Sequence, residues 1–248
     1  MPTRIPLPSE FHRDAGRLAV ITVVLLCCAF AGEVADILIN LHIASVADGL
    51  VHQPSTVTTE QIHQLEQLRD FDRLLMPALM LAAAIPFLIW FRRTRENAES
   101  FGPGAIKSDP GWAVGCWFVP VVFLWAPLRV VHDIRRASAL PGGRDVLTAR
   151  LVNTWWTLWL ATTMGAPLLG VVLDGIYLDR ASDTADVGAV SIEARAVANI
   201  VAGGFGTLAA AAAVLVVRAL TAQQRLRAAR QAPQARPEPA VGTAAESV

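Results

Sequence analysis

Two carboxylates, Glu33 and Asp36, lie well inside an apolar block near the N-terminus. They are three residues apart and therefore share one face of a helix. Acidic side chains at such a depth point by default to a proton or cation site. The structural alternative is an ion pair near the outer interface with Arg195, which lies at a comparable depth in the last apolar block. A third interpretation is that a water-exposed extension of the first helix begins at Gly32.

The sequence contains no catalytic motif. It lacks the Gly-x-x-x-x-Gly-Lys phosphate loop, the His-Glu-x-x-His zinc motif and the Gly-x-Ser-x-Gly nucleophile turn. His42, His52 and His63 have no metal-ligand spacing, and all three cysteines fall inside apolar blocks. We therefore expect no enzymatic activity, no cofactor, no metal site and no nucleic-acid binding.

Composition predicts the elements that must position these groups. The chain of 248 residues is 54% hydrophobic and 17% charged, with a mean hydropathy of +0.45, which is too apolar for an ordinary soluble domain. We predict an all-α integral membrane protein. A cleaved signal peptide is the alternative for the N-terminus, but the apolar run continues beyond the candidate cleavage site. Five apolar blocks approach or exceed the roughly 18–20 residues that cross a bilayer: 18–43, 74–91, 112–131, 151–173 and 194–217.

The distribution of Lys and Arg predicts the topology. If all five blocks cross and the N-terminus is inside, 9 cations lie inside and 12 outside, against the positive-inside rule. If block 112–131 does not cross, 17 lie inside and 4 outside. We therefore predict four transmembrane helices in a bacterial inner membrane, with both termini cytoplasmic. A kinked fifth span is the alternative.

The third block has features of a segment that enters the membrane without crossing it. Pro120 and Pro127 each remove a backbone donor and interrupt a straight helix. Pro127 suits the first turn of a new helix. Residues 112–126 are accordingly predicted to form a re-entrant or interfacial segment, whose backbone must be covered by other helices.

Residues 127–138 are predicted to form a basic amphipathic helix at the cytoplasmic interface. Together with the arginines at 92, 93 and 95, this helix forms a basic belt on the cytoplasmic side. The positive-inside rule alone can explain the belt, and the alternative is that it docks anionic lipids or a protein. The charged face of the helix includes Arg129, Asp133 and Arg136.

Tryptophans gather around the same segment. The predicted role is a cytoplasmic aromatic belt that fixes the segment against the fourth span, and the alternative is a ligand pocket. The residues are Trp112, Trp117, Trp125, Trp155, Trp156 and Trp159.

The domain boundaries follow from the same patterns. Thr58 and Gln61 form a capping box that predicts a helix from about residue 59 to residue 91, roughly 50 Å long. It would project outside the bilayer as part of an outer helical hairpin, 44–73. The predicted parts are a cytoplasmic tail 1–17, a membrane domain 18–220 with the non-spanning segment 112–138, and a disordered cytoplasmic tail 221–248.

Small residues recur every four positions in the last block, from Ala194 to Ala210. Such a ridge lets a second helix approach closely. It predicts either intramolecular packing or the seam of a homodimer.

Several distinctive motifs lie between about residues 90 and 160. They are RRTRENA at 92–98 (which includes Asn97), Gly111-Trp112, WFVP at 117–120, LWAP at 124–127, DIRRAS at 133–138 and WWTLW at 155–159. Together these motifs resemble domain-of-unknown-function family 4328, whose members are multi-pass bacterial membrane proteins, mostly actinobacterial. The resemblance supports the fold and assigns no activity, and Phe123 and Arg135 depart from the family pattern.

The sequence favours a non-enzymatic membrane scaffold or interaction protein that works through its basic, aromatic cytoplasmic face. The alternative is a small transporter or channel-like oligomer that uses Glu33 and Asp36. A lipid-acting enzyme is the third hypothesis.

Overall fold

The computed structural model describes residues 8–52, 57–101, 106, 108–140, 145–180 and 184–231. Helix accounts for 91% of them and no strand occurs among them, which confirms the all-α prediction. The elements are α1 (Pro8–His52), α2 (Thr59–Ser100), α3 (Pro110–Gly115), the 3₁₀ turn η2 (Val122–Leu124), α4 (Ala126–Ser138), α5 (Val146–Leu160), the π-helical turn η3 (Ala161–Gly165), α6 (Ala166–Arg180) and α7 (Thr184–Gln231).

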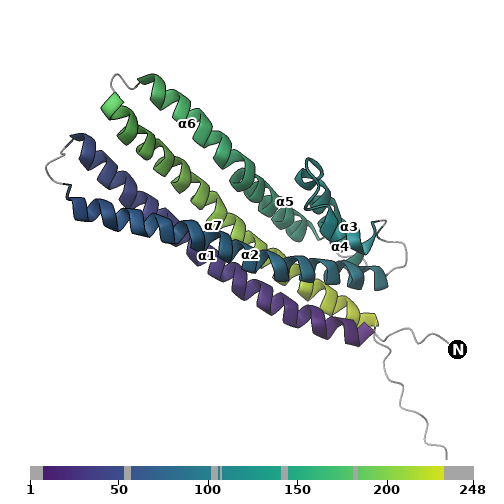
Figure 1. Cartoon of the computed structure of the whole chain (residues 1–248). Helices are drawn as coiled ribbons and strands as arrows, with labels where there is room; N and C mark the ends of the chain where they lie inside the picture. Colours follow the sequence, from purple (N-terminus) through teal and green to yellow (C-terminus); the bar gives the residue numbers. More distant parts are fainter. Residues whose placement is uncertain are drawn as a thin grey trace, which may run out of the picture.

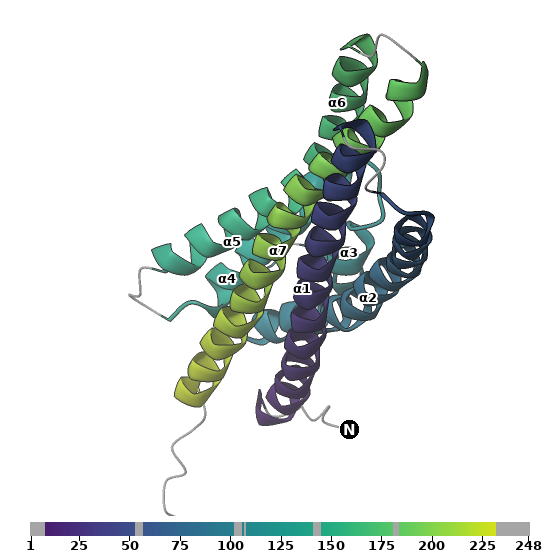
Figure 2. The ribbon, with the colours of Figure 1, turned by 90° about the vertical axis from the view of Figure 1, so that its left-hand side faces the viewer.

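Three long helices form the body of the molecule (Figures 1 and 2). α1 and α7 pack against each other along much of their length, and α2 packs against α1. The α5–η3–α6 rod lies beside α7, while α3 and α4 gather near the C-terminal half of α2. We call the end that holds α3 and α4 the α4 end. The opposite end, where α1 ends and α2 begins, is the hairpin end.

The helices are those of a membrane protein. Three of them are long and apolar enough to cross a bilayer, within Ala15–Gly49, Thr59–Ser100 and Arg195–Gln231. A fourth crossing results if Val146–Gly165 and Pro167–Ile176 count as one span, bent by 42°. The bend has a local cause, because Pro167 has no N–H for the carbonyl of the preceding turn.

Helix α2 begins as predicted and ends later. The Thr58 side chain accepts a hydrogen bond from the Gln61 N–H and the Gln61 side chain accepts one from the Thr58 N–H, which confirms the capping box. The helix continues past residue 91 to Ser100, because polar residues of its last turns are buried against neighbouring helices.

Helix α7 also continues beyond its predicted end. Residues 221–231, predicted to begin a disordered tail, are helical because their polar side chains bond to α2, α4 and the start of α5. Residues 232–248 and 1–7 lie outside the described part, and α1 begins at Pro8, within the predicted N-terminal tail.

The small residues of α7 face α1. Two members of the predicted ridge lie inside the protein: a Cβ added at Gly206 would lie 2.7 Å from Oε2 of Glu33 on α1, and Ala198 is buried. These two residues therefore pack within the chain, as one of the two predicted alternatives requires.

Between α3 and α4 the chain makes a strained turn. Val121 has φ 66° and ψ −44°, and the Val122 N–H donates to the Pro120 carbonyl at 2.7 Å. This is a γ-turn of the rare, strained kind. Pro127 lies in the first turn of α4, as predicted.

Candidate functional site

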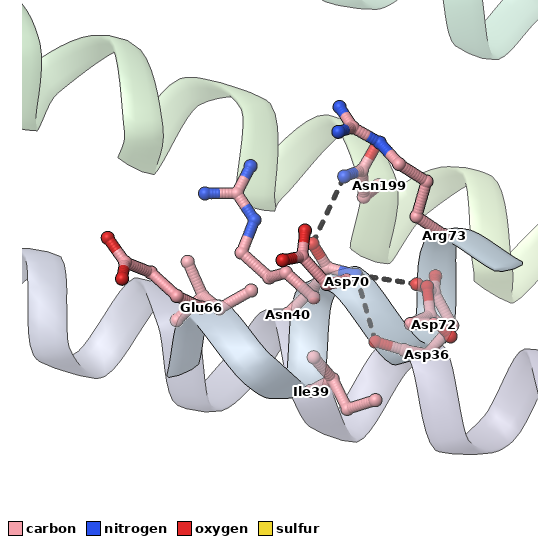
Figure 3. A pocket seen from close by; sticks show the side chains of 10 residues that line it. Asp36, Ile39, Asn40, Glu66, Asp70, Asp72, Arg73 and Asn199 are labelled. Atoms are coloured by element: carbon pink, nitrogen blue, oxygen red, sulfur yellow. Dashed lines mark hydrogen bonds between the residues drawn. The ribbon is translucent and has the colours of Figure 1, made fainter. Parts of the chain in front are cut away.

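A polar pocket of about 530 Å³ opens between α1, α2 and α7 at the hairpin end (Figure 3). We call it the acidic pocket, because four acids and two arginines line it and the acids dominate. Its polar lining consists of Asp36 and Asn40 from α1, Glu66, Arg69, Asp70, Asp72 and Arg73 from α2, and Asn199 from α7.

A chain of hydrogen bonds crosses the pocket from α7 to α1. The Asn199 amide donates to Oδ1 of Asn40 at 3.1 Å, and the Asn40 amide donates to Oδ1 of Asp36 at 2.9 Å. The Asp72 carboxyl of α2 lies within hydrogen-bonding reach of Asp36.

Glu33 lies one helical turn deeper than Asp36. It is 7% exposed, and its carboxyl group packs flat against the backbone of Gly206 on α7. A Cβ added at Gly206 would lie 2.7 Å from Oε2 of Glu33 and 2.8 Å from its Cδ. A larger residue at this position would therefore force the carboxyl group to move.

The position of Gly206 sets the depth of Glu33. Gly206 lies 11 residues after Arg195 and 12 before Arg218, the two charges that bound the uncharged stretch of α7. At 1.5 Å per residue the carboxyl group is about 17 Å along α7 from each of these two charges, whereas Asp36 of the pocket is one helical turn away on α1. A charge buried at this position is costly unless it is neutralised by a proton, a cation or a paired group.

The predicted pairing of Glu33 or Asp36 with Arg195 is wrong. The Arg195 guanidinium lies 3.6 Å from Oδ2 of Asp174 on α6, and its side chain is 67% exposed. Arg195 faces the α5–η3–α6 rod, whereas Glu33 and Asp36 face the α1–α7 seam and the pocket. Within the described residues, no group of three or more His, Cys, Asp or Glu is arranged to hold a metal ion.

Of the polar residues that line the pocket, the sequence analysis named only Asp36. It missed Asn40, Asn199 and Asp72 in particular, the residues that connect Asp36 to α7 and α2. Asn40 had a usable signal, because it lies four residues after Asp36 and thus on the same helix face. Asn199 is an isolated amide in an apolar block, and its partner Asn40 is 159 positions away. Asp72 lies at the edge of its block and has no comparable signal.

A second polar cluster joins α2, α4 and α7 at the α4 end. The Gln224 amide donates to the Thr94 carbonyl at 2.8 Å and to Oγ of Ser138 at 3.2 Å. The Trp90 indole donates to Oγ1 of Thr221 at 3.2 Å. These five side chains are buried, so the bonds replace those that water would otherwise make.

Asn97 lies beside this cluster without joining it. It is 1% exposed, and neither Nδ2 nor Oδ1 of its side chain has a hydrogen-bond partner among the described residues. Arg95, two positions earlier, is equally buried and bonds to Glu99 and to the Ser108 carbonyl. Arg95 therefore ties the segment before α3 to α2.

Asp145 anchors the start of α5. Gln223 of α7 donates to its Oδ2 at 2.6 Å, the Thr148 N–H donates to its Oδ1 at 3.3 Å, and the Arg135 guanidinium lies 3.6 Å away. Burial raises the pKa of Asp145, but the bonds from Thr148 and Gln223 and the Arg135 charge outweigh it. The pKa therefore lies below its ordinary value of 3.8.

This lowered pKa predicts acid sensitivity. The bonds to ionised Asp145 stabilise the fold fully above pH 3.8, and that contribution is lost as the pH falls through the lower, folded-state pKa. The unfolding midpoint of the wild type in detergent, measured from pH 7 to pH 3, should fall more steeply at the acid end than that of Asp145→Asn. Parallel curves would contradict this role.

The tryptophans form a packed cluster rather than a ring of exposed side chains. Trp117, from the loop after α3, contacts five aromatic rings, those of Phe87 and Phe91 on α2 and of Trp155, Trp156 and Trp159 on α5. The Trp156 indole donates to the Leu124 carbonyl at 3.1 Å. Segment 112–126 therefore packs against α5. Among the tryptophans, only Trp112 and Trp125 are more than 40% exposed.

Helix α4 uses its apolar face inside the protein and not against lipid. Val130, Val131 and Ile134 are at most 3% exposed, because α2, α5 and α7 cover them. This corrects the expectation of a helix lying on the interface. The charged face stays outside: Arg129 stacks over the Trp125 ring at 4.4 Å, Asp133 pairs with Arg136 at 3.5 Å, and Pro120 precedes the helix in an exposed turn.

A comparison with models of known protein families identifies the family of this chain. The family model described as Domain of unknown function (DUF4328) matches residues 54–222, well over half of the chain. The chain belongs to this family. The DUF4328 match covers α2 to α6 and most of α7, and so includes Asp72, Asn97, the tryptophan cluster, Asn199 and Gly206. Glu33 and Asp36 lie on α1, before the DUF4328 match begins. Among curated proteins and among solved structures, no match was found.

Proposed function

We propose that this membrane protein is a small proton-coupled transporter or channel-like oligomer, with Glu33 as its central proton-binding group. The observation that carries the proposal is the Glu33 carboxyl, 7% exposed and packed against Gly206 about midway between the charges of α7. In such an apolar environment the protonated, neutral form of a carboxyl group has the lower free energy. The group becomes charged only when its proton leaves.

The acidic pocket supplies the route for that proton. Asp36 and Asp72 both line the pocket, and Asp36 is one helical turn from Glu33. On the other side of Glu33, α1 has ten uncharged residues, 23–32, before the buried Thr22. This conformation is therefore open toward the hairpin end and closed toward the α4 end, as alternating access requires at one stage of transport.

The orientation in the membrane follows from charge. We infer four spans, with the α5–η3–α6 rod as one of them, in a bacterial inner membrane. The cationic α4 end would face the cytoplasm, the acidic hairpin end would face outward, and both termini would be cytoplasmic. Segment 112–126 would then meet the cytoplasmic surface of the bilayer with its exposed Phe118 and Val121.

The test is proton flux. The purified full chain is reconstituted in liposomes that contain a pH-sensitive dye, and a potassium–valinomycin potential drives protons. Flux should be present in the wild type and fall at least about tenfold in Glu33→Gln, since the glutamine amide cannot take up and release a proton as a carboxyl group does. The matched control is Glu60→Gln, an exposed acid of the first turn of α2 that lies outside the pocket lining. Absence of wild-type flux, or equal flux in Glu33→Gln, would overturn the proposal.

A membrane scaffold is the second candidate function, and the exposed face of α4 favours it. Arg136 is 71% exposed there, and Arg129 is held in place by the Trp125 ring. Deleting the helix would remove core residues, so surface changes are the appropriate test. If Arg129→Gln/Arg136→Gln keeps its thermal midpoint and loses a stoichiometric co-purifying protein, the scaffold is supported. If the same proteins still co-purify with the variant, the exposed face of α4 is not the docking surface.

A further inference from the structure

A second cavity lies at the α4 end, on the side of α2 that faces α3. Its volume is about 360 Å³. Leu88 and Ile89 form one part, Arg92, Arg93 and Glu96 form the next turn of α2, and Val114 of α3 closes it. The lining therefore changes from apolar to charged within two helical turns.

The sequence of α2 places this change at a membrane boundary. Residues 74–91 carry no charge, and Arg92 is the first charged residue after them. A helix of that length spans about 27 Å, close to the thickness of the hydrocarbon layer. Leu88 and Ile89 thus lie at the level of acyl chains, and the arginines lie at the level of the headgroups.

Glu96 arranges the two arginines. Nε of Arg92 lies 3.0 Å from its Oε1, and a terminal nitrogen of Arg93 lies 3.5 Å from its Oε2. One carboxylate thus holds two guanidinium groups, which leaves a net charge of +1 beside the apolar lining. The Arg92 and Arg93 side chains are 58% and 45% exposed, so their remaining donors face outward.

We propose that this groove binds one anionic phospholipid, with its phosphate on Arg92 and Arg93 and an acyl chain along Leu88, Ile89 and Val114. Guanidinium groups match phosphate because their paired N–H donors form two parallel bonds to its oxygens. The apolar part selects a lipid over a soluble phosphate. The acidic pocket lies at the opposite end of the bundle, so this inference stands independently of the proton proposal.

The experiment is native mass spectrometry of the full chain in detergent, titrated with phosphatidylglycerol and, separately, with phosphatidylcholine. Phosphatidylglycerol should bind more tightly, and Arg92→Gln/Arg93→Gln should weaken its binding about tenfold, the loss of roughly one to two cations near a charged surface. The matched control is Arg129→Gln/Arg136→Gln, which removes the same charge at the same end and should change the affinity less than twofold.

Three results would overturn the proposal. One is equal weakening by the control pair, which would reduce the effect to net charge. Another is equal binding of phosphatidylcholine. The third is full competition by soluble glycerol phosphate, which would make the groove a plain anion site. If the double variant has a lowered thermal midpoint, Arg93→Gln alone keeps the shorter Arg92–Glu96 contact, and an affinity equal to that of the wild type would then overturn the proposal.

Discussion

Replacing Trp117 with alanine should lower the free energy of unfolding by about 3 kcal/mol. The ring lies within 6.4 Å, centroid to centroid, of five other aromatic rings, from α2 and from α5. Its removal leaves a cavity that these large, rigid rings cannot fill by small shifts. It also releases the loop between α3 and α4, because Trp117 is the loop's aromatic contact with both helices.

Thermal unfolding in detergent measures the loss, and limited proteolysis locates it. The expected result is a midpoint several degrees lower and new cleavage between residues 116 and 125. Trp112→Ala is the matched control, since Trp112 is 43% exposed and makes no aromatic contact among the described residues. It should change the stability by no more than about 0.5 kcal/mol. Equal effects of the two substitutions would show that the cluster does not hold the loop.

Replacing Gly206 with valine should destabilise the α1–α7 seam by about 2 kcal/mol. Three atoms of the Glu33 carboxyl group would lie within 3.0 Å of the new Cβ, and Glu33 is only 7% exposed, so the group must move against its neighbours. Glu33 would be driven out of its position, so proton flux should fall together with the thermal midpoint.

Two further variants separate a clash with Glu33 from a general effect of a larger residue. A Cβ at Gly204 meets nothing within 4 Å, so Gly204→Val should leave the midpoint and the flux almost unchanged. In the Gly206→Val background, Glu33→Ala removes the clashing carboxyl group and should restore most of the stability, though not the flux. Failure of this rescue would mean that Glu33 and Gly206 are not coupled.

The sequence predicted what depends on local patterns. The start of α2 follows from the Thr58 capping box, and the long helices follow from uncharged stretches of sufficient length. The common helix face of Glu33 and Asp36 needed only helical geometry. The DUF4328 motifs pointed to the correct family without naming a site.

The remainder depends on pairings between distant parts of the chain. Helix α7 was predicted to end near residue 220, because the apolar content of the sequence drops there. The helix continues because Gln224 is buried and bonds to the Thr94 carbonyl and the Ser138 side chain. Positions within the apolar blocks suggested that Arg195 and Glu33 lie at a comparable depth, but Glu33 packs against Gly206, 11 residues along α7 from Arg195. The offset between α1 and α7 separates the two side chains, and no local signal in the sequence reports this offset.

The stability of the fold does not explain why residue 121 is a valine and not a glycine. A non-glycine residue in such a backbone conformation costs roughly 1–3 kcal/mol, and glycine would adopt φ 66° without that penalty. Its side chain is 68% exposed, so contacts within the protein return little of the loss. Valine at the tip of this loop therefore lowers the stability of the fold and places a branched hydrocarbon group on the surface. The contacts that favour valine over glycine here are then contacts with the surroundings of the protein.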